Sequence, residues 1–183
     1  MGQDERARFE SLFRENVRPL LAYALARTDA HRAHDVVSST FLVAWRRLND
    51  VPAEPLPWLI AVARRVLAEQ RRSEIRSRSL RTRLSLAVAA SRSETEDLAE
   101  VAALTDSVRA ALGRLRPGDR ELLVMVAWHG FNTEQLAMAL GCSKSVASLR
   151  LHRARRRFAS LLERLDDAGN FEKPVMRPAR EIP

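Results

Sequence analysis

A dense run of cationic side chains between Thr133 and Phe158 is the part of this sequence best suited to bind a ligand. From Lys144 onward no acidic residue occurs until Glu163, so no carboxylate along this basic stretch opposes an anion at its surface. Arginine and lysine clusters of this kind bind phosphate groups, above all those of a nucleic-acid backbone. The basic residues of the run are Lys144, Arg150, Arg153, Arg155, Arg156 and Arg157.

Two predicted helices must position these cations. The first covers Glu134–Leu140 and ends at Gly141, which tolerates the left-handed conformation found after a helix C-terminus. Ala137 is small where the two helices must cross, and the hydroxyl of Ser143 can cap the second helix. Residues expected to face a core recur along the second helix: Ala147, Leu151, Ala154, Phe158, Leu161 and Leu165. The layout is typical of a helix-turn-helix, whose second helix enters the DNA major groove. The alternative is an amphipathic hairpin with a merely solvated arginine face.

The whole chain is basic. Its 183 residues carry a formal net charge of +8, which favours an acidic partner, either nucleic acid or an anionic membrane. The longest uncharged apolar stretch, Leu122–Trp128, is far too short to cross a bilayer, and residues 1–10 lack the apolar core of a signal peptide. Cys142 is the single cysteine, which excludes an intrachain disulfide and a cysteine-cluster zinc site. We therefore expect a cytoplasmic protein that does not bind membranes.

Helical periodicity extends over nearly the whole sequence and predicts an all-α fold. A first helix is expected from Phe9 to Arg27, with a kink or break at Pro19. Asp29 can cap a second helix, which runs to about Leu48. The apolar stripe of that second helix is Val36, Val37, Thr40, Phe41, Ala44, Trp45 and Leu48.

A proline-rich loop is predicted from Asn49 to Pro57, because prolines do not fit a helix interior. A third helix follows from about Trp58 to Arg78. Its first half is apolar and its second half is rich in arginine. Its arginines are Arg64, Arg65, Arg71, Arg72, Arg76 and Arg78.

The sequence predicts two small helical domains joined by a flexible linker, the second containing the helix-turn-helix. Weak periodicity marks the linker, which has room for a short helix at Leu84–Ala90, and helices are expected at Leu98–Leu115 and Asp119–Trp128. The tail has three prolines and no period, so we expect it to be disordered. The predicted boundaries are 1–80 for the first domain, 81–97 for the linker, 98–165 for the second domain and 166–183 for the tail.

Segments on both sides of the linker resemble one known family, in the order found in that family. Residues 35–48, DVVSSTFLVAWRRL, resemble the core-binding segment of the extracytoplasmic-function (ECF) sigma factors, the smallest sigma subunits of bacterial RNA polymerase. Residues 57–68, PWLIAVARRVLA, resemble the segment that handles the minus-ten promoter element. In the second half, the matching residues are Leu115, Pro117, Arg120, Glu121 and the run His152-Arg153-Ala154-Arg155.

The resemblance implies three sets of contacts. Residues implied in binding the polymerase core are Asp35, Ser38, Ser39, Arg46 and Arg47. Residues implied at the minus-ten element are Asn49, Asp50, Arg64, Arg65, Arg71 and Arg72. Residues implied at the upstream, minus-thirty-five element are Lys144, Ser148, Leu149, Arg150, His152, Arg153, Arg155 and Arg156.

Within the upstream set, base contacts are expected from Ser148, Leu149, His152 and Arg153, and phosphate contacts from the remaining four residues. Leu149 is alternatively a loosely packed surface leucine. The stripe positions of Phe41 and Trp45 place them in the core, and Trp58 is expected to be buried rather than stacked on a base. The partners implied are polymerase core, duplex and single-stranded promoter DNA, and an anti-sigma factor. No cofactor is implied.

Two other functions remain as alternatives. A free-standing helix-turn-helix regulator would bind duplex DNA as a dimer without polymerase core, but it leaves the arginine-rich third helix unexplained. An enzyme is not supported, because the sequence has no glycine-rich phosphate loop and no trusted catalytic ordering of Ser, His and Asp. His31, His34 and Asp35 have helical spacing that fits a metal site, yet no fourth ligand is evident and such residues are usually solvated.

Overall fold

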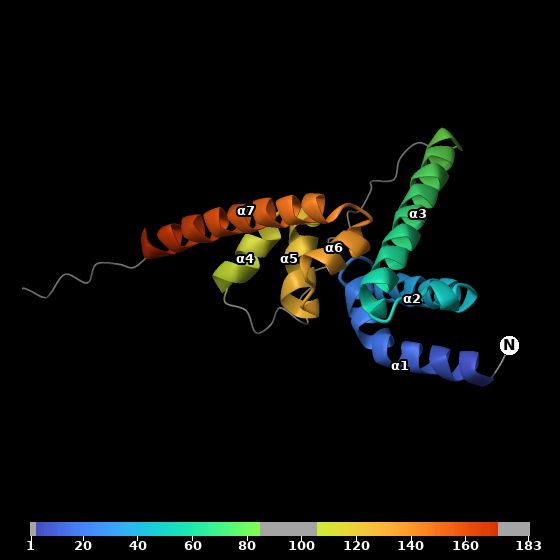
Figure 1. The fold of residues 1–183 in the computed structure, drawn as a ribbon. Coiled ribbons are helices and arrows are strands. Elements are labelled where there is room, and N and C mark those ends of the chain that lie inside the picture. Colours follow the sequence, from blue (N-terminus) through green and yellow to red (C-terminus); the bar gives the residue numbers. More distant parts are fainter. Residues whose placement is uncertain (1–2, 85–105, 172–183) are drawn as a thin grey trace, which may run out of the picture.

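The protein, represented by a computed structural model that describes residues 3–84 and 106–171, is helical throughout these ranges (Figure 1). The all-α prediction is thus confirmed for the described residues. The elements are α1 (Gln3–Leu25), α2 (Ala30–Arg46), the short 3-10 helix η1 (Leu48–Asp50), α3 (Pro55–Leu84), α4 (Asp106–Arg114), α5 (Pro117–His129), α6 (Thr133–Leu140) and α7 (Lys144–Phe171).

Helices α1, α2 and α3 pack against one another and form the first helix group. Leu20, Leu59 and Ile60 are fully buried at its centre. A kink or break was expected at Pro19; α1 runs through it as one element, so the helix is not broken there. The one polar side chain buried in α1, Asn16, donates to the Leu12 carbonyl oxygen at 2.9 Å, which satisfies it within the helix.

Helix α2 begins and packs as its sequence predicts. The Asp29 side chain accepts a hydrogen bond from the Arg32 backbone N–H at 3.0 Å, as expected of an N-cap. Phe41 is buried in the core, as predicted. Trp45 is only half-buried, and its ring meets Phe9 edge-on with 4.7 Å between ring centroids. The predicted apolar stripe therefore faces α1 and α3.

Helix α3 is longer at both ends than predicted. It begins at Pro55 rather than near Trp58, because prolines in the first turn of a helix lack only N–H groups that would have no intrahelical partner. It continues to Leu84 rather than ending near Arg78. The stretch Ser79–Leu84 contains no glycine or proline, so nothing in it stops a helix. The first residues assigned to the linker are therefore helical.

Helix α7 is the centre of the second helix group, since α4, α5 and α6 each pack on it. Gly141 ends α6 with φ 64° in the left-handed region, as predicted. The Ser143 hydroxyl accepts from the Val146 backbone N–H at 3.3 Å, which confirms the predicted cap. Ala137 is buried where α6 meets α7, as expected of a small residue at a close crossing.

The end of α7 differs from the prediction. The tail was expected to lose order after Leu165, but the helix continues to Phe171. The first proline beyond it is Pro174, so no imino acid interrupts these added residues. The rest of the tail, the short helix predicted after Leu84 and the first part of the helix predicted from Leu98 lie outside the described residues.

The two helix groups touch each other. Helix α6 lies against the first half of α3 (Figure 1). A single cluster of buried apolar residues includes Leu59 and Ile60 of α3 together with Leu136 of α6 and Met125 of α5. The second group is thus held on the first by packing as well as by the polar contacts described below.

Gly141→Ala is expected to lower the free energy of unfolding by about 1–2 kcal/mol, because a non-glycine residue is strained in the left-handed region. No atom lies within 4 Å of a Cβ placed there, so the cost comes from the backbone alone. Urea unfolding followed by circular dichroism measures it. Gly113→Ala is the matched control: it lies in α4, equally free of neighbours, and should cost nothing. Equal losses in both variants would contradict this explanation.

Candidate nucleic-acid interface

The outer face of α7 is a continuous cationic surface. Burial of Ala147, Leu151 and Ala154 fixes the rotation of the helix about its axis, so the opposite face points to solvent. Phe158, Leu161 and Leu165, further along the predicted apolar side, are half-buried. All eight residues predicted to contact the upstream element are exposed: Lys144, Ser148, Leu149, Arg150, His152, Arg153, Arg155 and Arg156.

Most cations on this face have no acidic partner within the described part of the chain. Arg150, Arg153, Arg155 and Arg156 make no ion pair there, whereas Lys144 lies 3.6 Å from Glu134 of α6. Arg157 differs from its neighbours, because its guanidinium binds Asp119 of α5 at 2.6 Å. The charge of Arg157 therefore holds the second group together, while the other four guanidiniums remain available to phosphates.

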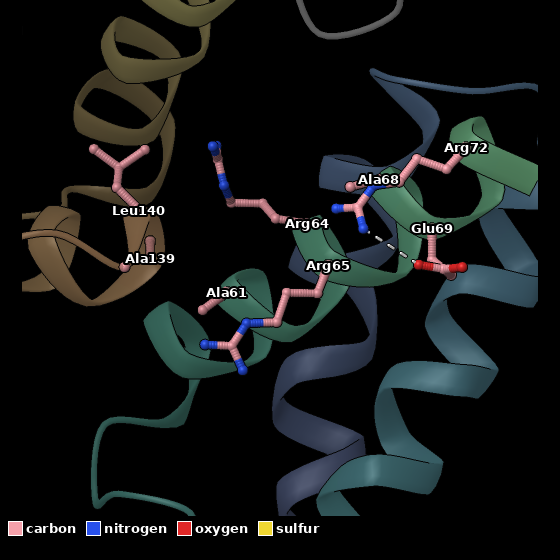
Figure 2. Close-up of a pocket in the computed structure, with 9 residues that line it drawn as sticks. Ala61, Arg64, Arg65, Ala68, Glu69, Arg72, Ala139 and Leu140 are labelled. Carbon is pink, nitrogen blue, oxygen red and sulfur yellow. Dashed lines mark ion pairs between the residues drawn. The ribbon is translucent and has the colours of Figure 1, made fainter. Parts of the chain in front are cut away.

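A second set of arginines lies on α3. Arg65, Arg71 and Arg72 are exposed, and Arg72 lies 3.6 Å from Glu69 one turn away. Arg64, Arg65 and Arg72 line a cavity of about 460 Å³ between α3 and α6, facing Ala139 and Leu140 (Figure 2). Their guanidinium groups point in different directions in Figure 2, so they do not form one pocket for a single small anion.

Arg64 is engaged inside the protein. Its guanidinium binds the Glu121 carboxylate of α5, across the boundary between the two helix groups. The same carboxylate accepts a 2.7 Å hydrogen bond from the Tyr23 hydroxyl of α1 and lies 3.3 Å from Nε of Arg27. Arg27 also stacks on the Tyr23 ring, 3.7 Å from its centroid. Three side chains, from the end of α1, the residues just after it and α3, thus meet at one largely buried carboxylate of α5.

The pKa shifts in this cluster follow from its burial and its charges. Burial alone would raise the pKa of Glu121, but Arg27 and Arg64 outweigh it and hold that pKa below its ordinary range. Burial would lower the pKa of Arg64, and the Glu121 carboxylate reverses this and raises it. Burial raises the pKa of Tyr23, so its hydroxyl remains a hydrogen-bond donor. At neutral pH, Glu121 and Arg64 are therefore charged and the Tyr23 hydroxyl keeps its proton.

The surface of α2 carries the residues predicted to bind a polymerase. Asp35, Ser38 and Arg46 are exposed, and Ser39 is half-buried. Arg47 binds Asp50 at 2.8 Å, which ties the end of α2 to η1, and Asn49 beside it is exposed. These side chains lie outside the buried stripe of α2 formed by Val36, Val37, Thr40, Phe41 and Ala44.

Two sequence profiles match the two helix groups: Sigma-70 region 2 matches residues 12–77, and Sigma-70, region 4 matches residues 105–158. The ECF RNA polymerase sigma factor SigL of Mycobacterium tuberculosis is 30% identical to this chain over 167 residues. The match covers 88% of this chain and 92% of SigL. The chain belongs to the ECF sigma factors.

Another sigma factor is similar in sequence, and a solved structure shares the fold. This sigma factor is 34% identical over 167 residues to the probable RNA polymerase sigma factor RfaY of Xanthomonas campestris pv. campestris. The match covers 87% of this chain but only 41% of RfaY. The sigma factor RpoE of Bartonella quintana, solved with the anti-sigma factor NepR, has the same fold with a TM-score of 0.58 and 24% identity. That likeness covers 85% of this chain and 96% of RpoE.

Three features of this sigma factor were not predicted. The Glu121 carboxylate contacts Tyr23, Arg27 and Arg64, which are distant from it in the sequence, and no local sequence pattern indicates these contacts. Leu42 of α2 is exposed between the predicted polymerase-binding residues. Trp58 is half-buried rather than buried, because it lines a second cavity, of about 440 Å³, with Met138 of α6 on another wall. The exposure of Leu42 was detectable from its position off the stripe of α2, whereas the other two features depend on how the groups dock.

The described part of this sigma factor contains neither a metal-binding cluster nor a membrane-spanning helix. Within residues 3–84 and 106–171, no three side chains of His, Cys, Asp or Glu gather closely enough to hold a metal ion. His31 and Asp35 lie 3.9 Å apart along one exposed face of α2. In the same residues, no helix combines the length and apolar character needed to cross a bilayer.

Proposed function

We propose that this sigma factor binds bacterial RNA polymerase core, directs it to specific promoters and promotes DNA opening, with a separate surface for each step. The observation that carries the proposal is the presence of two exposed arginine surfaces, on α3 and α7, in helix groups that match sigma regions 2 and 4. Both surfaces suit phosphate binding. We infer that the protein acts in the cytoplasm, where promoters and polymerase are found.

The α7 surface is the proposed reader of the upstream duplex. Ser148, Leu149, His152 and Arg153 would contact base edges, and an arginine reaching guanine with two hydrogen bonds supplies roughly 1–3 kcal/mol of discrimination. Lys144, Arg150, Arg155 and Arg156 would bind phosphates, which position the helix without reading sequence. The exposure of all eight side chains on α7 supports their assignment to DNA.

The α3 surface and the loop before it are the proposed minus-ten site. Arg65, Arg71 and Arg72 would track a separated strand, and Asn49 with Asp50 would help to hold a base. Arg64 joins this set only when its contact with Glu121 is broken. Trp58 adds an aromatic wall to the neighbouring cavity, which suits an unstacked base or an apolar side chain.

The α2 surface is the proposed docking site for polymerase core. Asp35, Ser38, Ser39, Arg46 and Arg47 supply polar contacts, and the exposed side chain of Leu42 adds an apolar one. We further propose that an anti-sigma factor restrains the protein, since the similar RpoE was solved with such a partner. Sigma factors are transcription initiation factors, and we propose on that basis that the protein is not an enzyme.

A free-standing regulator that binds DNA as a dimer without polymerase is not favoured. It would explain α6 and α7 but would leave the region 2 match over α1–α3 without a purpose. No described feature of the molecule supports it in preference to a sigma subunit.

Run-off transcription tests the proposed function. Bacterial core polymerase would be assayed on a promoter library with and without the protein. Protein-dependent initiation from templates sharing paired upstream and downstream elements is the expected result. Duplex binding by the protein alone, with no initiation on any template, would instead favour the free-standing regulator.

Arg153→Ala is expected to relax the preference at one or two base pairs of the upstream element, by roughly 1–3 kcal/mol, and to leave binding of polymerase core unchanged. Arg156→Ala, on the same helix, is the matched control. It should weaken all duplexes about equally and reduce the slope of log affinity against log salt by about one. Competition binding on duplex variants at two salt concentrations separates the two effects. Identical behaviour of the two variants would refute the division into base and phosphate contacts.

Arg71→Ala combined with Arg72→Ala is expected to slow open-complex formation at least several-fold and to leave duplex binding of the upstream element unchanged, because α3 is assigned to the opened strand. Permanganate footprinting of unpaired thymines measures opening, and a mobility-shift assay measures duplex binding. Loss of core-polymerase binding in this variant and in Arg153→Ala alike would show that the assigned roles are wrong.

A further inference from the structure

We propose that four side chains form a latch that holds this sigma factor in a closed, self-inhibited form until engagement of polymerase and promoter draws its two helix groups apart. The latch consists of Tyr23, Arg27, Arg64 and Glu121. The proposal rests on the proposed function, because the surface that the latch covers is the one assigned to the minus-ten element.

The bonds of the latch cross from one helix group to the other. Glu121 comes from α5, whereas its three partners come from α1, from the residues just after α1 and from α3. Its side chain is only 15% exposed, so solvent and salt screen the contact weakly. Hydrogen bonds to a buried carboxylate from two guanidiniums and a hydroxyl are among the stronger polar contacts in proteins. The latch is therefore able to bias the position of an entire helix group.

A second polar contact lies on another part of the same boundary. Gln135 of α6 donates to the carboxylate of Glu54, just before α3, at 2.6 Å. Glu54 is exposed and Gln135 is half-buried, so this contact contributes less than the more deeply placed latch. Its position shows that α6 is held near the beginning of α3 as well as at Arg64.

The closed arrangement obstructs the proposed minus-ten site. The guanidinium of Arg64 is paired with the Glu121 carboxylate. Arg65 and Arg72 line a cavity whose opposite wall is formed by Ala139 and Leu140 of α6 (Figure 2). Helix α6 thus occupies space along α3 that a tracked DNA strand would need. The cationic face of α7 remains exposed in the same arrangement. The closed form is consequently competent for duplex binding but not for capture of the opened strand.

The spacing of promoter elements gives an independent reason for opening. Elements named for positions minus thirty-five and minus ten are about 25 base pairs apart, which is about 85 Å of duplex at 3.4 Å per base pair. In the closed form, α6 contacts α3 and is separated from the recognition helix α7 only by a short turn. One molecule in this form cannot reach both elements, so the two groups must separate before both are bound.

Removing the charge of Glu121 should shift the protein toward the open form. Glu121→Gln leaves Arg27 and Arg64 packed together without a counter-charge, a cost that disappears when the groups part. If the closed form dominates in the free protein, the apparent affinity for any target that requires the open form rises with the open fraction. The variant should therefore act at lower sigma concentration than the wild type.

Asp119→Asn is the matched control. Asp119 lies on the same helix, its side chain is 14% exposed, and it binds an arginine, but that arginine is Arg157 of the same helix group. Both substitutions remove one negative charge, so a general electrostatic effect on DNA binding would appear in both. Only a latch effect is specific to Glu121→Gln.

Small-angle X-ray scattering and transcription then give the decisive comparison, on full-length proteins whose helix content is first checked by circular dichroism. Glu121→Gln should have a larger radius of gyration than the wild type and Asp119→Asn, and should reach half-maximal initiation at about tenfold lower concentration. Binding of a duplex carrying only the upstream element should be equal in all three. An unchanged radius together with an unchanged concentration dependence would overturn the latch.

Tyr23→Phe keeps the test decisive if Glu121→Gln does not fold. It removes one hydrogen-bond donor without changing charge or packing volume, and a smaller shift in the same direction is expected. No shift in a folded Tyr23→Phe protein, when Glu121→Gln is unfolded, would count against the latch, since the cluster would then serve stability alone.

A cross-link that locks the closed form tests whether this form prevents promoter opening. Glu54→Cys and Gln135→Cys, in a Cys142→Ser background, would be joined by a short cleavable bis-maleimide. The joined protein should lose promoter opening, keep duplex binding and recover opening after cleavage, while each single-cysteine protein stays active. Full opening by the joined protein would overturn the proposal. Failure of the wild type to initiate on any promoter would reject the proposed function instead, and the scattering comparison would still decide the latch.

Discussion

Packing helices this rich in arginine against one another requires carboxylates at the points of contact. The chain has an excess of eight positive charges, and bare guanidiniums meeting across helix boundaries would repel. Pairs that join different helices supply the compensation: Arg32 of α2 with Glu74 of α3, Arg157 of α7 with Asp119 of α5, and Arg64 of α3 with Glu121 of α5. Arg150, Arg153, Arg155 and Arg156, which make no ion pair within residues 3–84 and 106–171, lie on the outer face of α7, where a nucleic acid can neutralise them. The distribution of acids thus separates arginines that build the fold from those that bind a ligand.

Local periodicity made much of the fold and of the duplex-reading face predictable. The apolar positions Ala147, Leu151 and Ala154 are spaced within one helix, so the orientation of the neighbouring arginines followed from them. The turn at Gly141 was equally predictable, because a single backbone conformation demands a particular residue there. In both cases, neighbours in the sequence determine the local structure.

Features that depend on distant partners escaped the sequence. Tyr23 and Glu121 are 98 positions apart, and neither lies in a pattern that marks it as a partner of the other. Arg64 was assigned to DNA with its arginine neighbours because all have the same residue type, yet its surroundings differ from theirs. The ends of α3 and α7 also differ from the prediction. The added part of α3 contains no proline or glycine, and α7 continues through Gly169 because no proline interrupts it before Pro174.

The shared carboxylate of Glu121 has a consequence for how this sequence can change over evolutionary time. Loss of the acid would leave two partly buried guanidiniums without a counter-charge, and loss of either arginine would leave the acid with fewer donors. Substitutions at Arg27, Arg64 and Glu121 should therefore be inherited together among related chains, although the three residues lie in different helix groups. In a lineage that replaces all three with apolar residues, packing alone would hold the two helix groups together. The conditions that separate the groups would then differ from those that separate them in this protein.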